Sequence, residues 1–151
     1  MLSDVVRETI KEDLIKHEGY KQEIYLCSEG IPTFGIGHAV KESDIEYTWP
    51  VGTPVEKERI DQCFTDDFKD ACTDCDVLFL QFASLPTQVQ RVLVNMAFNL
   101  GRNRLGKFKK MVKAVNEGNF VEAANQMVDS RWYNQVGNRS VELENWMRNA
   151  S

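Results

Sequence analysis

Three side chains that can take part in proton transfer lie in one short stretch of the chain: Glu18, Cys27 and Thr33. A carboxyl group can donate or accept a proton, an ionised thiol can accept one, and a hydroxyl group can orient water. Taken alone, the trio also fits an ordinary fold, with Glu18 a solvated carboxylate at a helix end and Thr33 a strand threonine. The choice between these interpretations depends on the surrounding sequence.

The cysteines form a second candidate group, because Cys72 and Cys75 make a Cys-x-x-Cys pair. A zinc site would need two more ligands, and the only histidines in the sequence are His17 and His38. Cys75 also lies on an apolar helical stripe, where a free cysteine behaves as a small hydrophobic residue. We therefore expect reduced structural thiols, no bound metal and no cofactor.

Charge is divided unevenly along the chain, whose net charge is −5. Residues 1–84 carry a net charge of −10, whereas residues 85–151 carry +5. Six of the basic side chains lie between Arg102 and Lys113. That segment is interpreted either as a solvated helix face with a basic loop beside it, or as an electropositive wall for an anionic ligand. The net negative charge argues against nucleic acid as a partner.

Hydrophobic spacing places Glu18 at the end of a helix, just before a sheet. Apolar residues recur every four positions from Val6 to Leu14, which indicates an amphipathic helix that Gly19 ends. Residues 20–52 combine β-branched and aromatic residues with turn residues. This composition predicts a small antiparallel sheet.

A long amphipathic helix is predicted after the sheet. Thr53, Pro54 and Glu56 resemble a capping box with proline in the first turn. Apolar residues then recur at intervals of three or four as far as Phe82, which indicates a helix of more than 20 residues.

The rest of the chain has a helical pattern. We expect Gly101 to end one helix, Asn119 to cap another and Ser140 to cap the last, with an irregular aromatic stretch from Ser130 to Asn138.

These elements predict an α+β fold: a small antiparallel-sheet lobe and a mainly helical lobe joined by a long helix. We expect one domain over residues 1–151, with approximate lobes at 1–55 and 84–151 and the connecting helix at 54–83. A cleft between lobes is a common ligand site. No window is long and apolar enough to span a bilayer, and the N-terminal residues lack the apolar core of a secretory signal.

Three blocks of sequence, in order along the chain, resemble one known family. They are Glu18-x8-Cys27-x5-Thr33 continuing as Phe-Gly-Ile-Gly-His at 34–38, Val-Asn-Met-Ala-Phe-Asn-Leu-Gly at 94–101, and Ser-Arg-Trp-Tyr-Asn-Gln at 130–135 with Asn138-Arg139 after it. The family is that of the phage-type lysozymes, glycoside hydrolase family 24. Its pattern has Glu, eight residues, Asp or Cys, five residues, Thr and a Gly-Ile-Gly-His turn.

The resemblance implies a lysozyme-like fold and hydrolysis of the β-1,4 bond between N-acetylmuramic acid and N-acetylglucosamine in bacterial peptidoglycan. It implies that Glu18 is the general acid that protonates the leaving oxygen, with Cys27 and Thr33 at the position of the water or base. Glu18 would have to keep its proton near neutral pH. Partial burial favours the protonated form and a paired cation opposes it.

Cys27 departs from the family members that have aspartate at this position. A neutral thiol neither accepts a proton from water nor stabilises positive charge on a sugar well. Cys27 has three interpretations. In the first, it is a thiolate with a lowered pKa that acts as base or nucleophile. In the second, Thr33 holds the water and Cys27 only lies beside it, and in the third the protein has lost activity. Because the family pattern admits cysteine, we favour retained lytic activity with inversion at the anomeric carbon.

The resemblance also implies substrate-binding residues in both lobes. They are Gly37 and Ala39 beside the turn, and Phe98, Asn99 and Arg131 in the helical lobe. Packing in the core is an equal alternative for Phe98.

Three further residues are implied to support the site. Arg139 matches a family arginine that pairs with the catalytic glutamate. His38 is paired in the family with an aspartate on the long helix, and Asp67 is the matching residue. We interpret His38 and Asp67 as a structural ion pair between sheet and helix rather than a catalytic dyad.

The implied role is an endolysin that causes host cell lysis, with peptidoglycan as its partner. Without a signal sequence, it would be made in the host cytoplasm as a monomer, without stable membrane insertion. It would act on the periplasmic wall after another protein permeabilises the membrane. The alternatives are a catalytically weak peptidoglycan-binding module with the same fold, and a tail-associated or secreted antibacterial lysozyme effector.

Overall fold

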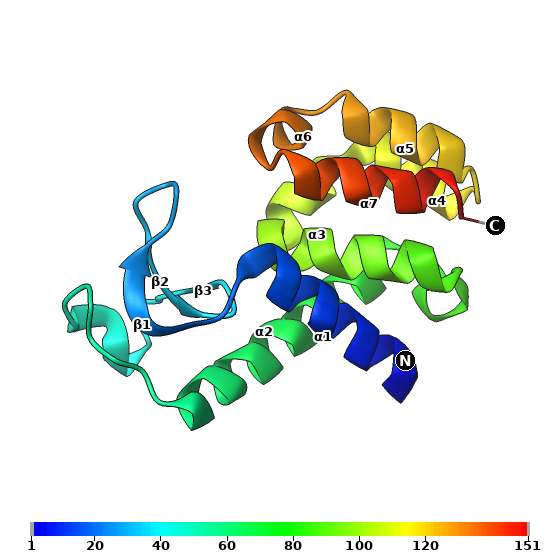
Figure 1. Cartoon of the computed structure of the whole chain (residues 1–151). Helices are drawn as coiled ribbons and strands as arrows, with labels where there is room; N and C mark the ends of the chain where they lie inside the picture. The colour runs from blue at the N-terminus through cyan, green and yellow to red at the C-terminus, as the bar shows by residue number, and fades with distance from the viewer. Residues whose placement is uncertain (1, 151) are drawn as a thin grey trace. The chain divides into compact units, whose positions relative to one another are not determined.

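The computed structural model describes residues 2–150, which form two compact units (Figure 1). The sheet unit comprises residues 11–69. The helical unit comprises the described residues up to Ile10 together with those from Asp70 onward. The architecture is α+β, as predicted from the sequence.

The sheet unit is built on three short antiparallel strands. They follow one another in space in the order β1 (Lys21–Leu26), β2 (Pro32–Gly35) and β3 (His38–Ala39), and a 3₁₀ turn, η1 (Ile45–Thr48), comes after them. Ile24 and Phe34 of the sheet are at most 1% exposed, as is Ile60 in the helix that follows. The predicted small antiparallel sheet is therefore confirmed, and its strands are positioned by a compact apolar core.

Two long helices have the predicted apolar stripes. Helix α1 (Asp4–Glu18) buries Ile10 and Leu14 completely. Helix α2 (Lys57–Leu78) has 22 residues, and its stripe includes the fully buried Cys75. The length of α2 agrees with the predicted helix of more than 20 residues. Its end differs from the prediction, because α2 stops at Leu78 and Phe82, the last residue of the predicted stripe, lies in a separate 3₁₀ turn.

The predicted capping box at the start of α2 is wrong. Pro54 forms an antiparallel bridge with Glu23 on β1, and the Ile24 N–H donates to the carbonyl oxygen of Thr53. The backbone groups of this segment thus pair with the free edge of β1 and cannot form the first hydrogen bonds of a helix that starts at Thr53. The segment stays extended, and α2 begins at Lys57.

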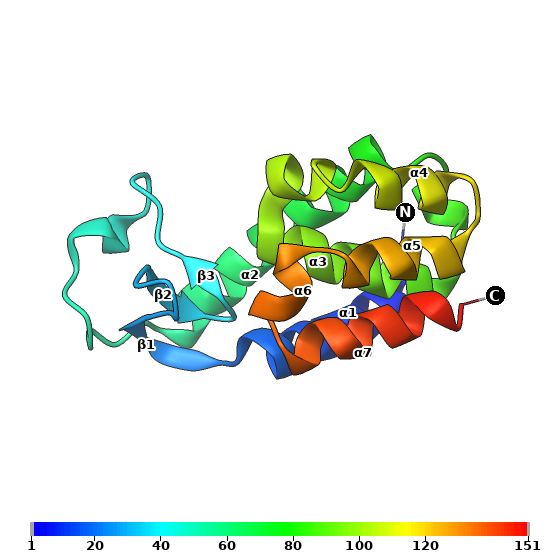
Figure 2. The same ribbon diagram turned by 90° about the horizontal axis from the view of Figure 1, so that it is seen from above.

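The helical unit is a cluster of short helices around a shared core. It contains η2 (Phe82–Ser84), α3 (Thr87–Gly106), α4 (Lys109–Asn116), α5 (Phe120–Val128), α6 (Arg131–Gln135) and α7 (Asn138–Arg148). Helix α5 packs against α4 and α7, and α7 also packs against α3 (Figure 2). None of the described helices is both long enough and apolar enough to cross a membrane.

Two predicted helix boundaries in this unit are confirmed. The Asn119 side chain accepts a hydrogen bond from the Glu122 N–H and caps α5, as predicted. Gly101 has a non-helical backbone, with φ of +79°, and ends the first of the two helical segments that make up α3. The second segment continues from this kink as far as Gly106.

The stretch expected to be irregular is partly helical. The Ser130 hydroxyl accepts a hydrogen bond from the Tyr133 N–H and caps the five-residue helix α6. Ser140 does not cap the last helix. It lies inside α7, where its buried hydroxyl donates to the Gly137 carbonyl oxygen, 2.8 Å away.

Candidate functional site

Glu18 is the last residue of α1, and the packing of that helix determines where its carboxyl group lies. Ile10 and Leu14 anchor one face of α1 in the core. Gly19, with φ of +84°, ends the helix as predicted. The half-buried Glu18 side chain therefore projects from a fixed helix end.

The turn between β2 and β3 closes directly on Glu18. Gly37 in this turn has φ of +61°. A Cβ atom at Gly37 would lie only 2.8 Å from both Cδ and Oε1 of Glu18, which is closer than van der Waals contact allows. Gly37 therefore fits here because it has no side chain, and its backbone holds the Glu18 carboxyl group from one side. Its predicted contact with substrate stays a prediction.

The strands bring other candidate residues onto one face of the sheet. Tyr25 on β1 lies opposite Thr33 on β2, and Thr33 lies opposite Ala39 on β3. Paired residues on neighbouring strands project from the same face. Cys27 follows two residues after Tyr25, in the turn that leads into β2.

Cys27 lies in a turn that favours its ionised form. Burial of the thiol opposes ionisation, but hydrogen bonds from the backbone N–H groups of Glu29 and Ile31 lower the pKa of Cys27. A hydrogen bond from the Thr33 side chain lowers this pKa further. The Thr33 hydroxyl is also 2.8 Å from the Ile31 carbonyl oxygen. Since a hydroxyl has one proton, Thr33 donates either to that carbonyl or to the Cys27 sulfur.

The other three cysteines have the opposite tendency. Burial raises the pKa of Cys63 and of Cys72 to about 11, and it raises the pKa of Cys75 well above the ordinary thiol value. Cys75 is also completely buried in the apolar stripe of α2, in agreement with its interpretation as a small hydrophobic residue. Cys27 is therefore the first thiol to ionise as the pH rises.

We expect iodoacetamide to alkylate Cys27 first. Because the thiolate is the reactive form and the pKa of Cys27 is lowered, its alkylation rate should rise at a lower pH than that of an ordinary thiol. Cys63 and Cys72 should react at least tenfold more slowly at pH 8. Peptide mass mapping of protein quenched at intervals between pH 6 and 10 measures each rate. Equal rates for the three thiols would contradict the assignment.

Tyr25 was not singled out from the sequence, yet it lies close to both acidic candidates. Burial raises the pKa of Tyr25, and negative charge on Glu18 and Cys27 raises it further. The sequence feature that could have identified Tyr25 is its position two residues before Cys27, because residues two apart in a strand share a face. Glu18, Tyr25 and Cys27 thus form one electrostatically coupled group in the sheet unit.

His38 is held between two carboxylates. Its Nδ1 is 2.7 Å from Oδ2 of Asp67 on α2, the expected pair, and its Nε2 is 2.8 Å from Oδ2 of Asp44. His38 is 5% exposed. Burial opposes its protonation, but the hydrogen bonds to the two aspartates outweigh this effect and raise the pKa of His38. The geometry is that of a doubly bridged imidazolium, and nothing about Asp44 was predicted from the sequence.

A second ion pair holds the Asp44 segment in place. Arg59 on α2 donates from Nε and Nη2 to the two carboxylate oxygens of Glu46, at 2.8 and 3.0 Å. Glu46 is 1% exposed, and Arg59 Nη2 also lies 3.3 Å from Oδ1 of Asp44. Such a two-point contact fixes a loop more firmly than a single bond does. It explains how η1 presents Asp44 to His38.

The stability of the fold should decline above neutral pH because of His38. Its pKa is higher in the folded than in the unfolded chain, so its stabilising effect is complete below about pH 6.5 and is lost as the pH rises through the folded value. Urea denaturation between pH 5 and 9 measures this decline. An Asp67→Asn variant should lose more than half of the pH dependence, whereas Asp66→Asn, which changes an exposed neighbour on α2, should retain it. A parent curve that is flat above pH 6.5 would contradict the linkage.

In the helical unit, one candidate residue is hydrogen-bonded to a buried tryptophan. The Asn99 Oδ1 accepts a hydrogen bond from Trp132 Nε1 at 2.8 Å, and Phe98 next to it is half-buried. Arg131 is exposed and lines an open pocket. The bond to Trp132 fixes the orientation of the Asn99 amide, so that its nitrogen is the atom left for a ligand.

Arg139 is oriented by a buried asparagine. Its Nε and Nη2 donate to Oδ1 of Asn95, at 2.9 and 2.8 Å, and Asn95 is completely buried. A guanidinium group held at two nitrogens has a fixed direction. The predicted pairing of Arg139 with Glu18 stays a prediction.

The chain is similar to several known proteins. The phage lysozyme family matches residues 15–149. The chain is 30% identical to Probable T4-type lysozyme 2 of Dictyostelium discoideum, over 85% of this chain and 88% of the relative. It is 25% identical to the pre-baseplate central spike protein Gp5 of Enterobacteria phage T4, over 87% of this chain and 26% of that protein. It is also 25% identical to the peptidoglycan hydrolase gp36 of Pseudomonas phage phiKMV, over 86% of this chain and 14% of that protein.

Proposed function

Because the chain belongs to the phage lysozyme family, we propose that it is a muramidase that hydrolyses the β-1,4 bond between N-acetylmuramic acid and N-acetylglucosamine in bacterial peptidoglycan. One observation carries the proposal: the family match extends over residues 15–149, the range in which Glu18, Cys27, Thr33 and Gly37 lie. The lysozyme and peptidoglycan hydrolase names of its relatives support the same reaction class.

Glu18 acts as the general acid in this proposal. Its proton passes to the glycosidic oxygen while the bond between that oxygen and the anomeric carbon of N-acetylmuramic acid breaks. N-acetylglucosamine leaves with a new hydroxyl group at its C4. The contact with Gly37 supports this role, because it fixes the carboxyl group from which the proton departs.

Cys27 and Thr33 handle the attacking water. The Thr33 hydroxyl orients the water, and the Cys27 thiolate accepts one of its protons as the oxygen bonds to the anomeric carbon. The lowered pKa of Cys27 supports this assignment, because it raises the thiolate fraction near neutral pH. Exchange with solvent then returns Glu18 to its protonated form and Cys27 to its ionised form.

The remaining candidate residues bind the glycan. The Asn99 amide nitrogen donates to the carbonyl oxygen of an acetamido group, since its oxygen already accepts from Trp132. Phe98 packs against a sugar ring, and Arg131 faces the acidic substituents of the polymer.

Digestion of purified peptidoglycan should release muropeptides with N-acetylmuramic acid at the reducing end. Inversion predicts that the new anomeric hydroxyl is first in the α configuration, because the bond that breaks is β. Mass spectrometry of borohydride-reduced products identifies the reducing sugar, and rapid NMR of the fresh digest identifies the anomer. Reducing N-acetylglucosamine, or glycan binding without release of any product, would overturn the proposal. A β anomer would overturn inversion alone.

We further propose that the enzyme acts in host cell lysis. It is made in the host cytoplasm and reaches the periplasmic wall once another protein has permeabilised the membrane. A tail-associated role is the second candidate, because the chain also aligns with about a quarter of a phage central spike protein.

A further inference from the structure

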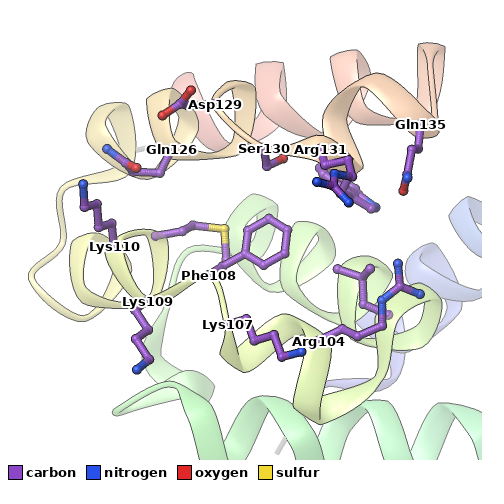
Figure 3. A pocket seen from close by; sticks show the side chains of 13 residues that line it. Arg104, Lys107, Phe108, Lys109, Lys110, Gln126, Asp129, Ser130, Arg131 and Gln135 are labelled. Carbon is purple, nitrogen blue, oxygen red and sulfur yellow. The ribbon is translucent and has the colours of Figure 1, made fainter.

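The helical unit contains an open pocket of about 640 Å³ whose lining includes five basic residues (Figure 3). Arg104 and Lys107 come from the end of α3 and the residue after it, Lys109 and Lys110 from the first turn of α4, and Arg131 from α6. A pocket of this volume can hold a ligand the size of a sugar. All five cations are exposed.

The basic residues between Arg102 and Lys113 do not all line this pocket. Arg102 forms an ion pair with Asp74, at 2.9 Å, and Lys113 lines a different pocket. Among residues 2–150, no hydrogen bond or ion pair occupies the side chains of the five cations in the basic pocket, and Asp129 is the one acidic residue in its lining. Four like charges in excess, held close together, are stabilised when an anion binds.

The side chains surround an aromatic ring. Figure 3 shows the Phe108 ring in the middle of the pocket, with Arg131 on one side of it and Arg104 and Lys107 on the other. Lys109 and Lys110 extend outward at the opposite end. Phe108 is half-buried, so part of the ring remains open to a ligand. Cations on two sides of a partly exposed ring suit a ligand that carries both charge and an apolar sugar face.

Backbone donors add to the positive potential of this pocket. The first helical hydrogen bond of α4 runs from the Val112 N–H to the Phe108 carbonyl oxygen, and Phe108 offers no side-chain cap. The N–H groups of the three residues before Val112 therefore have no acceptor within the helix. All three residues, Lys109, Lys110 and Met111, line the pocket.

A phosphate group fits this environment better than a carboxylate does. A phosphate monoester carries close to two negative charges and three acceptor oxygens, which suit guanidinium forks and helical N–H groups. A single carboxylate would leave most of the five positive charges unmatched. We propose that this pocket binds the phosphate group of a phosphorylated sugar, with the sugar ring against Phe108. That the sugar belongs to the bacterial cell wall rests on the proposed function.

Calorimetric titration of the full chain with four probes tests the ligand class. The probes are N-acetylglucosamine 1-phosphate, N-acetylglucosamine, inorganic phosphate and muramyl dipeptide, whose one acidic group is a carboxylate. We expect the sugar phosphate to bind at least tenfold more tightly than each of the other three. An affinity for muramyl dipeptide equal to or above that for the sugar phosphate would overturn the assignment, as would the absence of saturable binding. Binding of inorganic phosphate as tight as that of the sugar phosphate would overturn the role of Phe108.

Charge-matched variants test the location. Arg104→Gln combined with Lys107→Gln should weaken binding of N-acetylglucosamine 1-phosphate at least tenfold. Arg102→Gln combined with Lys113→Gln removes the same charge from the same segment outside the pocket, and it should change affinity less than twofold. Equal losses in both variants would show a general charge effect and overturn the site. Amide chemical shift changes in the parent protein should centre on Phe108 to Met111, and their absence there would also overturn it.

The two proposals can fail separately. Glu18→Gln protein should bind N-acetylglucosamine 1-phosphate as the parent does, because Glu18 does not line the pocket. If this variant no longer digests wall but still binds the sugar phosphate, the variant is folded and its loss of digestion comes from the missing acid. Loss of both activities in this variant would contradict the separation of the two sites. Binding without any muramidase activity in the parent would overturn the proposed function and leave the phosphate site standing.

Discussion

Replacing Glu18 with glutamine is expected to slow the release of muropeptides by about 10²–10⁴-fold, which is the contribution of a positioned general acid. Glutamine has nearly the same shape and can occupy the space beside Gly37, but it has no acidic proton to give to the leaving oxygen. The change should therefore lower kcat while leaving KM within a few-fold of the parent value. Reducing-end release from purified peptidoglycan measures both constants.

The matched control is Glu12→Gln, which makes the same substitution at an exposed position on the same helix. It should retain activity within twofold. Wall digestion by Glu18→Gln at the parent rate would remove Glu18 from the mechanism. Equal losses in the two variants would instead assign the effect to charge on α1.

Much of the scaffold was predictable because its signals are local. The stripes of α1 and α2, the helix end at Gly19 and the Asn119 cap depend on spacing within a few turns of chain. Such patterns are read directly from the sequence, and all of these features are present in the structure. The start of α2 was missed because Pro54 pairs with Glu23, a contact across 31 residues that no local pattern reveals.

The sequence names the candidate residues and the His38–Asp67 pair, but not the other interactions of the site. The spacing of Glu18, Cys27 and Thr33 carries the family resemblance, yet it says nothing about the chemical state of the thiol. That state depends on backbone N–H groups of the β1–β2 turn, which become donors to Cys27 only when the turn has folded. Asp44 escaped prediction for a similar reason, since it reaches His38 through a segment that Arg59 holds in place.

The basic segment gives a further example of tertiary structure separating residues that look alike in the sequence. From sequence, Arg102 and Arg104 are equivalent members of one charged run. In the structure Arg102 forms an ion pair with Asp74, whereas Arg104 lines the pocket with Lys107. The interpretation of the segment as a wall for an anionic ligand therefore applies to the pocket residues alone, and there it stays a proposal.

Replacing Gly37 with alanine should lower activity by about 10²-fold, because the new Cβ atom would lie 2.8 Å from the Glu18 carboxyl group. The methyl group cannot remain there, so either the turn or Glu18 must shift, and a displacement of about 1 Å at a catalytic group can cost 10²-fold in rate. Alanine at a φ of +61° should also destabilise the fold by about 1–2 kcal/mol. Muropeptide release and urea denaturation measure the two effects.

Gly52→Ala separates the loss of activity from the loss of stability. Gly52 has φ of +94°, but a Cβ atom there would meet nothing within 4 Å. This variant should therefore show a similar destabilisation of about 1–2 kcal/mol while keeping its activity within twofold. If both variants lose activity in proportion to stability, Gly37 is only a turn residue. If Gly37→Ala alone loses activity, the turn between β2 and β3 positions the general acid, and glycine is required there by the carboxyl group it contacts as well as by its own backbone.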